Sequence, residues 1–220
     1  MYPSKHLLFL FMLLTSPSKH NLSTKIQSGE RRLHFYGKGE EIPLLSQGVW
    51  GISRGFVQLI RVNPQGDETW LGWAAQDHFF GLWLTSLDSF KARALSDVYL
   101  QWYSLQEIEK SPQIAQNVLT QTVSRVRQNE QLLAIAGLKR VEDKLIALLR
   151  LLADSIGEKM NNGCSRITVR FTHQNLASAI GTTRVTVTRL LGDLQRDGLI
   201  FIDKQRHIIV QNPAVIMARN

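Results

Sequence analysis

One stretch of the chain, residues 113 to about 137, most limits what these 220 residues can fold into, because it is rich in good helix formers and contains no proline or interior glycine. We expect a single helix of about 25 residues, roughly 37 Å long. Two neighbouring stripes follow it at spacings of three and four: Leu119, Val123, Val126, Glu130 and Leu133 in one, and Val118, Thr122, Arg125, Asn129, Leu132 and Ala136 in the other. Apolar seams with this spacing pair with a second helix, so the sequence predicts a homodimer. The polar members of the stripes either face water at the rim of the helix or have a role besides packing.

The region before this helix, residues 22–110, has a different pattern, in which short segments of period two are separated by turn residues. We expect strands over residues 49–53, 55–62, 69–73, 79–81 and 98–103. The Asn-Pro-Gln-Gly-Asp turn at 63–67 supports this division, because proline fixes φ and glycine adopts the left-handed conformation. The spacing predicts a small antiparallel barrel or jelly roll.

The first 21 residues contain a short apolar run, residues 7–14, after Lys5 and His6. The layout is that of a short secretory signal, and the run is too short to span a bilayer. Three interpretations stay open: a signal peptide, an apolar segment packed on the fold, or a leader that precedes the true start. A single cysteine, Cys164, and a basic C-terminal region fit a cytoplasmic protein better than a secreted one.

The C-terminal region, residues 138–220, has the pattern of a DNA-binding module. We expect an amphipathic helix over 140–156, a strand over 167–171 and a helix over 173–180 that Thr172 caps. Gly181 then makes a turn, and a second helix begins at Thr182 or Thr183 and continues to about Leu194. Two short helices joined in this way form a helix-turn-helix. A hairpin over 199–210 completes the module as a wing.

Positive charge is concentrated in the same region. Residues 139–220 hold 13 basic and 7 acidic side chains, and so contribute +6 to the net charge of +8 of the whole chain. A basic module of this size indicates a polyanionic partner such as double-stranded DNA.

The second helix of the predicted helix-turn-helix has two distinct faces. The expected buried stripe consists of Val187, Leu190, Leu191 and Leu194. The residues left to face outward near the N-terminal end, which enters the major groove in such proteins, are Arg184, Val185, Thr188 and Arg189. Arginine donates two hydrogen bonds to guanine and valine contacts the thymine methyl group, so we predict that these four residues contact bases.

The order of barrel, long helix and winged helix resembles the Crp/Fnr family of bacterial transcription factors, named after the cAMP receptor protein and the fumarate–nitrate regulator. The stretch AIGTTRVTVTRLLGDL at 179–194 is most similar to the recognition helix of the cyanobacterial nitrogen regulators of that family. The resemblance implies an α+β fold with a cyclic-nucleotide-binding-like β-barrel at 22–110, a dimerisation helix at 111–137 and a winged helix-turn-helix at 138–220. Residues 1–21 are left as a leader or an uncertain start.

The resemblance also implies how the module contacts DNA. Arg184 and Arg189 read bases, and the expected phosphate contacts are Thr172, His173, Gln174, Thr183, Thr186 and Arg206. Many members of the family have glutamate where this chain has Val185, and this departure favours the GTA…TAC palindrome of the nitrogen regulators over a TGTGA half-site.

An effector pocket in the barrel is a further expectation from the resemblance, with Phe80, Gly81, Leu82, Arg93, Arg125 and Glu130 as its candidate residues. Family members that bind cAMP have a Gly-Glu pair and a phosphate-binding arginine, but here Leu82 follows Gly81 and the arginine position falls at Asp88. A carboxylate there would repel a phosphate, which argues against cAMP. The nitrogen regulators bind 2-oxoglutarate, for which the barrel arginine again falls at Asp88. The sequence therefore leaves three alternatives open: 2-oxoglutarate, a different small ligand, or none.

Other chemistry has little support in the sequence. One cysteine cannot hold an iron–sulfur cluster, and His34 and His78 are isolated histidines, so we expect neither a cluster nor a haem nor another metal site. Without the sequence motifs of a nucleophilic triad, a zinc protease or a nucleotide-binding loop, we expect a regulator and not an enzyme. The expected partners are double-stranded DNA, a second copy, RNA polymerase if the protein activates, and a co-regulator protein, with no membrane. The alternative is an effector-independent module that recruits a partner protein to DNA.

Overall fold

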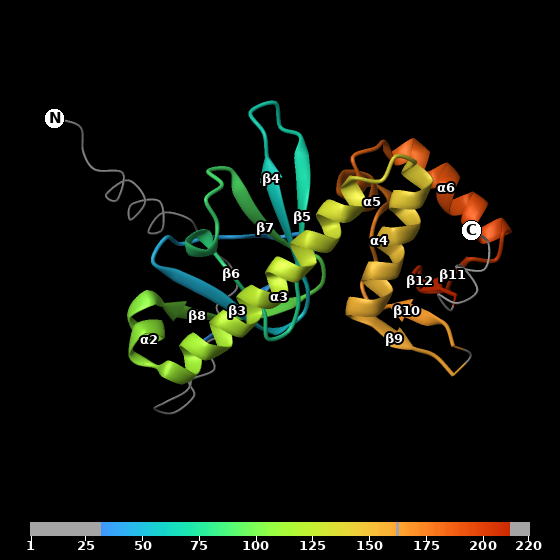
Figure 1. Cartoon of the computed structure of the whole chain (residues 1–220). Coiled ribbons are helices and arrows are strands. Elements are labelled where there is room, and N and C mark those ends of the chain that lie inside the picture. Colours follow the sequence, from blue (N-terminus) through green and yellow to red (C-terminus); the bar gives the residue numbers. More distant parts are fainter. Residues whose placement is uncertain (1–31, 162, 212–220) are drawn as a thin grey trace. The chain divides into compact units, whose positions relative to one another are not determined.

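The computed structural model describes residues 32–161 and 163–211 (Figure 1). Residues 1–21, on which the predicted leader falls, lie outside the described residues. The described residues from Arg32 onward belong to one compact unit. None of the helices in this described part is long and apolar enough to cross a membrane.

The N-terminal region contains two four-stranded antiparallel sheets that share an apolar core. One sheet has the order β1 (Leu33–Tyr36), β8 (Val98–Ser104), β3 (Gly48–Arg54) and β6 (Phe79–Phe80), and the other has the order β2 (Glu41–Ile42), β7 (Phe90–Ala94), β4 (Val57–Val62) and β5 (Glu68–Ala74). Alternate residues of the strands, among them Ile52, Leu59 and Leu100, are buried between the sheets. The expected antiparallel barrel is confirmed, and β1, β2 and β7 are strands beyond those expected.

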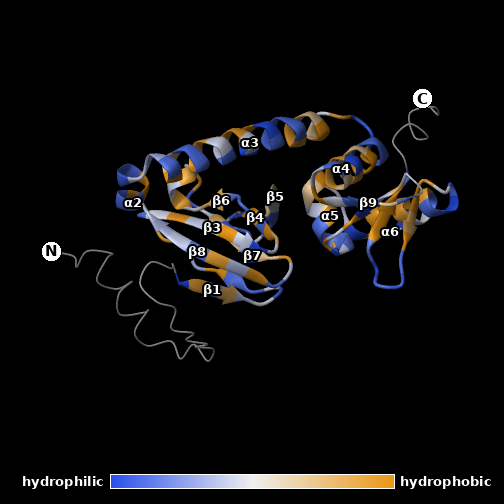
Figure 2. Cartoon of the chain, turned by 90° about the horizontal axis from the view of Figure 1, so that it is seen from below, coloured by the Kyte–Doolittle hydropathy of each residue, from blue (hydrophilic) through white to orange (hydrophobic). Residues whose placement is uncertain are grey.

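Two helices follow the barrel. α2 (Leu105–Lys110) begins with a capping box in which Ser104 and Glu107 satisfy each other's backbone N–H groups. α3 (Pro112–Ala136) starts at a proline, whose missing N–H costs nothing in the first turn, and extends over 25 residues as expected. Figure 2 shows hydrophobic residues recurring along α3 among hydrophilic ones.

The two stripes of α3 have different environments. In the second stripe, Val118 is buried against Val49, Phe79 and Ile108. In the first stripe every apolar member is exposed, namely Leu119 (65%), Val123 (44%), Val126 (51%) and Leu133 (75%). One side of the helix therefore packs against the barrel, while the other presents an apolar seam to solvent.

The C-terminal region comprises α4 (Val141–Ile156), a four-stranded antiparallel sheet and the helix-turn-helix pair α5 (His173–Ile180) and α6 (Arg184–Arg196). The sheet has the order β11 (Ile200–Ile202), β12 (Ile208–Val210), β10 (Ser165–Ile167) and β9 (Gly157–Lys159). Gly181 joins the two helices in the left-handed conformation, with φ at 66°, which glycine adopts without strain. The expected helix-turn-helix and wing hairpin are confirmed.

The strand expected over 167–171 is wrong in its extent. β10 ends at Ile167, and the N–H and the hydroxyl of Thr168 both donate to the carbonyl oxygen of Ile156, at 3.3 and 2.7 Å. Val169 and Phe171 are buried in the core of this region. Their alternation therefore reflects side-chain packing and not a sheet ladder.

Candidate DNA interface and barrel cavity

The N-terminal end of α6 is held by a cap and by its buried face. The hydroxyl of Thr183 accepts a hydrogen bond from the N–H of Thr186 at 3.2 Å, which satisfies one of the free donors at the helix start. All four residues of the expected buried stripe, Val187, Leu190, Leu191 and Leu194, are buried. All four residues predicted to contact bases are exposed, namely Arg184, Val185, Thr188 and Arg189. The buried stripe thus fixes the rotation of α6 that presents these residues to solvent.

Arg189 has an acidic neighbour that the sequence analysis did not single out. Its guanidinium donates to a carboxylate oxygen of Asp193 at 3.1 Å, one helical turn away, and Arg196 binds the other carboxylate oxygen. Exposed ion pairs of this kind contribute little to stability. The pair therefore does not hold the exposed Arg189 side chain firmly in one position.

The predicted phosphate contacts at the start of α5 have mixed environments. Thr172 is the N-cap: its hydroxyl accepts from the N–H of Asn175 at 3.1 Å. The Nδ1 atom of His173 lies 2.7 Å from the hydroxyl of Thr188, so the structure brings the first helix against the exposed face of the second. Gln174 lines the barrel cavity described below.

The wing carries Arg206 at its exposed tip, in a backbone conformation with φ at 63°. A polar network at the base of the wing orders this loop. Arg166 of β10 donates to Asp203 at 2.7 Å, and Asp203 also accepts from the backbone N–H of His207 at 2.8 Å. These hydrogen bonds, that from Arg166 above all, lower the pKa of Asp203 to about 2. The carboxylate is therefore charged at any ordinary pH.

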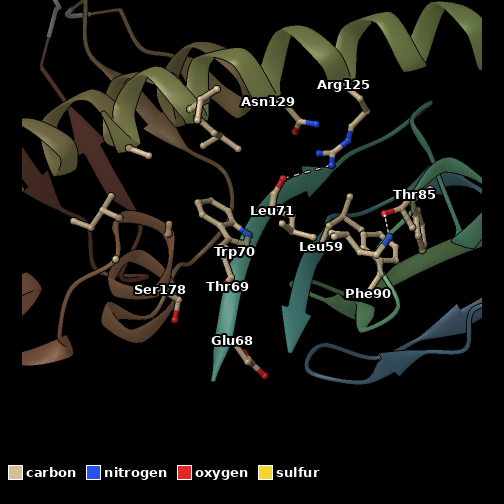
Figure 3. Close-up of a pocket in the computed structure, with 18 of the residues that line it drawn as sticks. Leu59, Glu68, Thr69, Trp70, Leu71, Thr85, Phe90, Arg125, Asn129 and Ser178 are labelled. Atoms are coloured by element: carbon tan, nitrogen blue, oxygen red, sulfur yellow. Dashed lines mark hydrogen bonds between the residues drawn. The ribbon is translucent and has the colours of Figure 1, made fainter. Parts of the chain in front are cut away.

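A cavity of about 1050 Å³ opens between the barrel and α3 and extends to residues of α5 (Figure 3). Of the predicted effector-pocket residues, Phe80, Gly81 and Arg125 line it. The other three, Leu82, Arg93 and Glu130, are not among its lining residues. The guanidinium of Arg93 instead forms a two-point ion pair with Glu68, at 2.5 and 3.0 Å.

Arg125 is engaged with the protein itself. Its guanidinium donates to the carbonyl oxygen of Leu71 on β5 at 3.5 Å (Figure 3). It also donates to the carbonyl oxygen of Trp73 at 3.1 Å and to the side-chain oxygen of Gln128. The same Gln128 oxygen accepts from the N–H of Trp73 at 3.3 Å. Burial lowers the pKa of Arg125 to about 10, so the side chain remains charged at neutral pH. Arg125 and Gln128 together form a clasp between α3 and β5.

The clasp depends on the glycine at position 72. Gly72 has φ at +118°, and a Cβ atom there would lie 2.4 Å from the Gln128 side-chain oxygen and 2.9 Å from the Arg125 guanidinium. We expect Gly72→Ala to lower the free energy of unfolding by about 2–4 kcal/mol, through backbone strain and displacement of the clasp. Denaturant titration measures this loss. Gly66→Ala is the matched control, because Gly66 also has a positive φ, +90°, with nothing within 4 Å of the added Cβ. Equal losses for the two variants would contradict the clasp.

The residues that could not be singled out from the sequence share one property: each holds another residue of the chain in place by a hydrogen bond. Gln128 could have been noticed, since it lies one turn after Arg125 on the same helix. Arg166 and Asp203 are 37 positions apart, and no local pattern marks their contact.

Comparison with known proteins agrees with this geometry. The family model for a Crp-like helix-turn-helix domain matches residues 143–219. The global nitrogen regulator of Synechococcus elongatus is 31% identical over 204 residues, which cover 89% of this chain and 89% of that protein. The regulatory protein CysR of the same organism is 30% identical over 183 residues, covering 82% of this chain and 84% of that protein. The solved structure of FixK2 from Bradyrhizobium japonicum has a TM-score of 0.71 at 19% identity, covering 86% of this chain and 96% of that one.

Proposed function

The chain belongs to the Crp/Fnr family of DNA-binding transcription regulators, and on that basis we propose that it binds a palindromic promoter site as a cytoplasmic homodimer. The observation that carries the proposal is the start of α6, where Arg184 and Arg189 flank the exposed Val185 and Thr188. A helix end of this kind enters the major groove, where arginine pairs with guanine and apolar groups contact thymine methyls. The relatives are transcription regulators, and we assign no catalytic role to this chain.

Dimerisation is proposed to use the exposed seam of α3. The seam extends from Leu119 to Leu133 and has the spacing of paired helices. Pairing two chains along it would place two recognition helices on one face of the DNA, with half-sites about 34 Å apart. The palindrome of the site then mirrors the twofold symmetry of the protein.

The proposed half-site is that of the nitrogen regulators, a GTA…TAC palindrome, because residues 179–194 resemble their recognition helix and Val185 stands where many members of the family have glutamate. Arg184 and Arg189 are assigned to bases. Phosphate contacts are assigned to Thr172, His173, Gln174, Thr183, Thr186 and Arg206. The partners proposed besides DNA are RNA polymerase, if the protein activates transcription, and a co-regulator protein.

The barrel region has two candidate roles. In one, 2-oxoglutarate or another small effector enters the cavity beside Phe80 and Gly81. In the other, the protein works without an effector and recruits a partner protein to DNA. A specific observation favours the second form: Arg125, the cation expected to bind an acidic effector, already donates to Leu71, Trp73 and Gln128.

Selection of bound DNA from a random pool, with and without 2-oxoglutarate, tests the proposal. We expect a palindrome with two half-sites to be enriched, and each mismatch to weaken binding by about 1–3 kcal/mol. Enrichment only with 2-oxoglutarate would identify the effector, and equal enrichment would support the effector-independent form. Recovery of unrelated sequences, bound with an affinity that depends only on salt, would contradict sequence-specific binding.

A further inference from the structure

The hydroxyl group of Thr188 is already used within the protein, although the residue lies exposed on the groove-facing side of α6. Its O–H donates to the carbonyl oxygen of Arg184 at 2.9 Å, four residues earlier in the helix. A threonine hydroxyl has one proton, so the contact of 2.7 Å with Nδ1 of His173 requires the histidine to be the donor. The two hydrogen bonds hold the oxygen against the helix backbone and the first helix of the pair.

Holding the oxygen in this way selects one rotamer of Thr188. A helical threonine whose hydroxyl bonds the carbonyl oxygen one turn back has its χ1 angle restricted. Because the oxygen and the γ-methyl group are attached to the same Cβ atom, fixing the oxygen also fixes the direction of the methyl group. The methyl group is then the part of Thr188 that is left to meet a ligand.

A second apolar group lies on the same face. Val185 is 79% exposed and three residues before Thr188, which makes the two side chains neighbours on the helix surface. Val185 does not belong to the apolar core of the described residues, and it is flanked by Arg184 and Arg189. The face therefore combines an apolar centre with a cationic residue at each side.

The apolar feature that the major groove offers is the C5-methyl group of thymine, and the acceptors that suit arginine are those of guanine. Resting on the function proposed above, we propose that Val185 and Thr188 recognise thymine through its methyl group, and that His173 is the positioning residue that turns the Thr188 methyl outward. In this assignment Thr188 reads no base through its hydroxyl, because that hydroxyl already bonds Arg184 and His173.

Deoxyuridine tests the proposal, because it differs from thymidine only by the absent methyl group. Each thymine of the selected half-site is replaced in turn by deoxyuridine, symmetrically in both half-sites, and the dissociation constants are compared. For the wild-type protein we expect affinity to fall about fourfold per lost methyl contact, or roughly 15-fold for the symmetric pair. We expect this loss at two thymine positions of the half-site, one for Val185 and one for Thr188.

Matched variants then assign each position. At the thymine position that Val185 contacts, Val185→Ala should bind thymine-containing and deoxyuridine-containing DNA equally. At the other thymine position, Thr188→Ser should do the same. Thr188→Val keeps a methyl group and removes the hydroxyl, so it should still discriminate. The opposite result, with Thr188→Ser still distinguishing thymine from deoxyuridine and Thr188→Val not, would show that the Thr188 methyl group does not read thymine and would overturn the proposal. Thermal unfolding checks that the variants remain folded, which is expected because both positions are exposed.

His173→Ala separates positioning from phosphate binding. If His173 positions Thr188, His173→Ala should reduce the discrimination between thymine and deoxyuridine only at the base that Thr188 contacts. The same substitution should have no such effect in the Thr188→Val variant. Loss of a phosphate contact only would weaken binding to both DNAs equally and reduce the salt dependence, which would overturn the role of His173. A preferred palindrome without any thymine-to-deoxyuridine difference would overturn this inference and leave the proposed function intact. Absence of any preferred site would overturn both.

Discussion

Replacement of Arg184 by alanine is expected to abolish the preference for the palindrome while weak binding to any DNA remains. A two-point contact between arginine and guanine contributes about 1–3 kcal/mol of discrimination, which corresponds to about 5- to 150-fold for each half-site. The remaining lysines and arginines still neutralise phosphates, so the variant should bind scrambled DNA almost as the wild-type protein does. Titration of cognate and scrambled duplexes at several salt concentrations measures both quantities.

Arg196→Ala is the control for this experiment. Arg196 lies at the other end of α6, is exposed and binds Asp193, so the substitution removes the same charge from the same helix. It should lower affinity for both duplexes slightly and leave their ratio unchanged. If Arg184→Ala discriminates as well as the wild-type protein does, the assignment of Arg184 to a base is wrong.

Disruption of the exposed seam of α3 should have the largest effect on DNA binding. In a parallel helix pair, equivalent residues of the two chains meet, so Val123→Glu would place two carboxylates in an apolar contact. We expect the variant to be a monomer. Because a linked pair of modules gains about 10²- to 10⁴-fold in affinity over a single one, affinity for the palindrome should fall by at least about 100-fold. Sedimentation velocity and DNA titration measure the two effects.

The neighbouring position offers a matched control. Ser124 is exposed on α3 but outside both stripes, so Ser124→Glu adds the same charge without entering the seam. This control should remain dimeric and bind the palindrome with little change. A dimeric Val123→Glu variant would show that the second copy uses a different surface, and a monomeric wild-type protein that still binds the palindrome tightly would contradict the dimer itself.

Local features of the fold could be predicted well from the sequence. The long helix was expected over 113–137 and is found at Pro112–Ala136, and Thr172 and Thr183 cap the two helices of the helix-turn-helix. Such features depend on neighbours within four residues, which the sequence lists directly. The strand expected over 167–171 failed for the opposite reason, because Val169 and Phe171 alternate to fill a core built from distant residues.

The site was predicted in part. The rotation of α6 follows from its own buried stripe, so the exposed positions of Arg184 and Val185 were predictable. The contacts of the residues at the cavity were less predictable. Arg125 was expected to offer its charge to an effector, but β5 carbonyl oxygens more than fifty positions away and Gln128 already accept its hydrogen bonds.

The sequence alone therefore determined the long helix α3, the helix α4 and the helix-turn-helix pair, about where each begins and which of their faces are apolar, since these properties arise from residue type and short-range spacing. The short helix α2 was not among the expected helices. Only the tertiary structure decided which polar groups are bonded across elements: Arg125 to β5, and the Thr188 hydroxyl to His173. The physical reason is that a hydrogen bond needs its donor and acceptor within about 3 Å and in line, a condition that folding imposes on residues which the sequence places far apart.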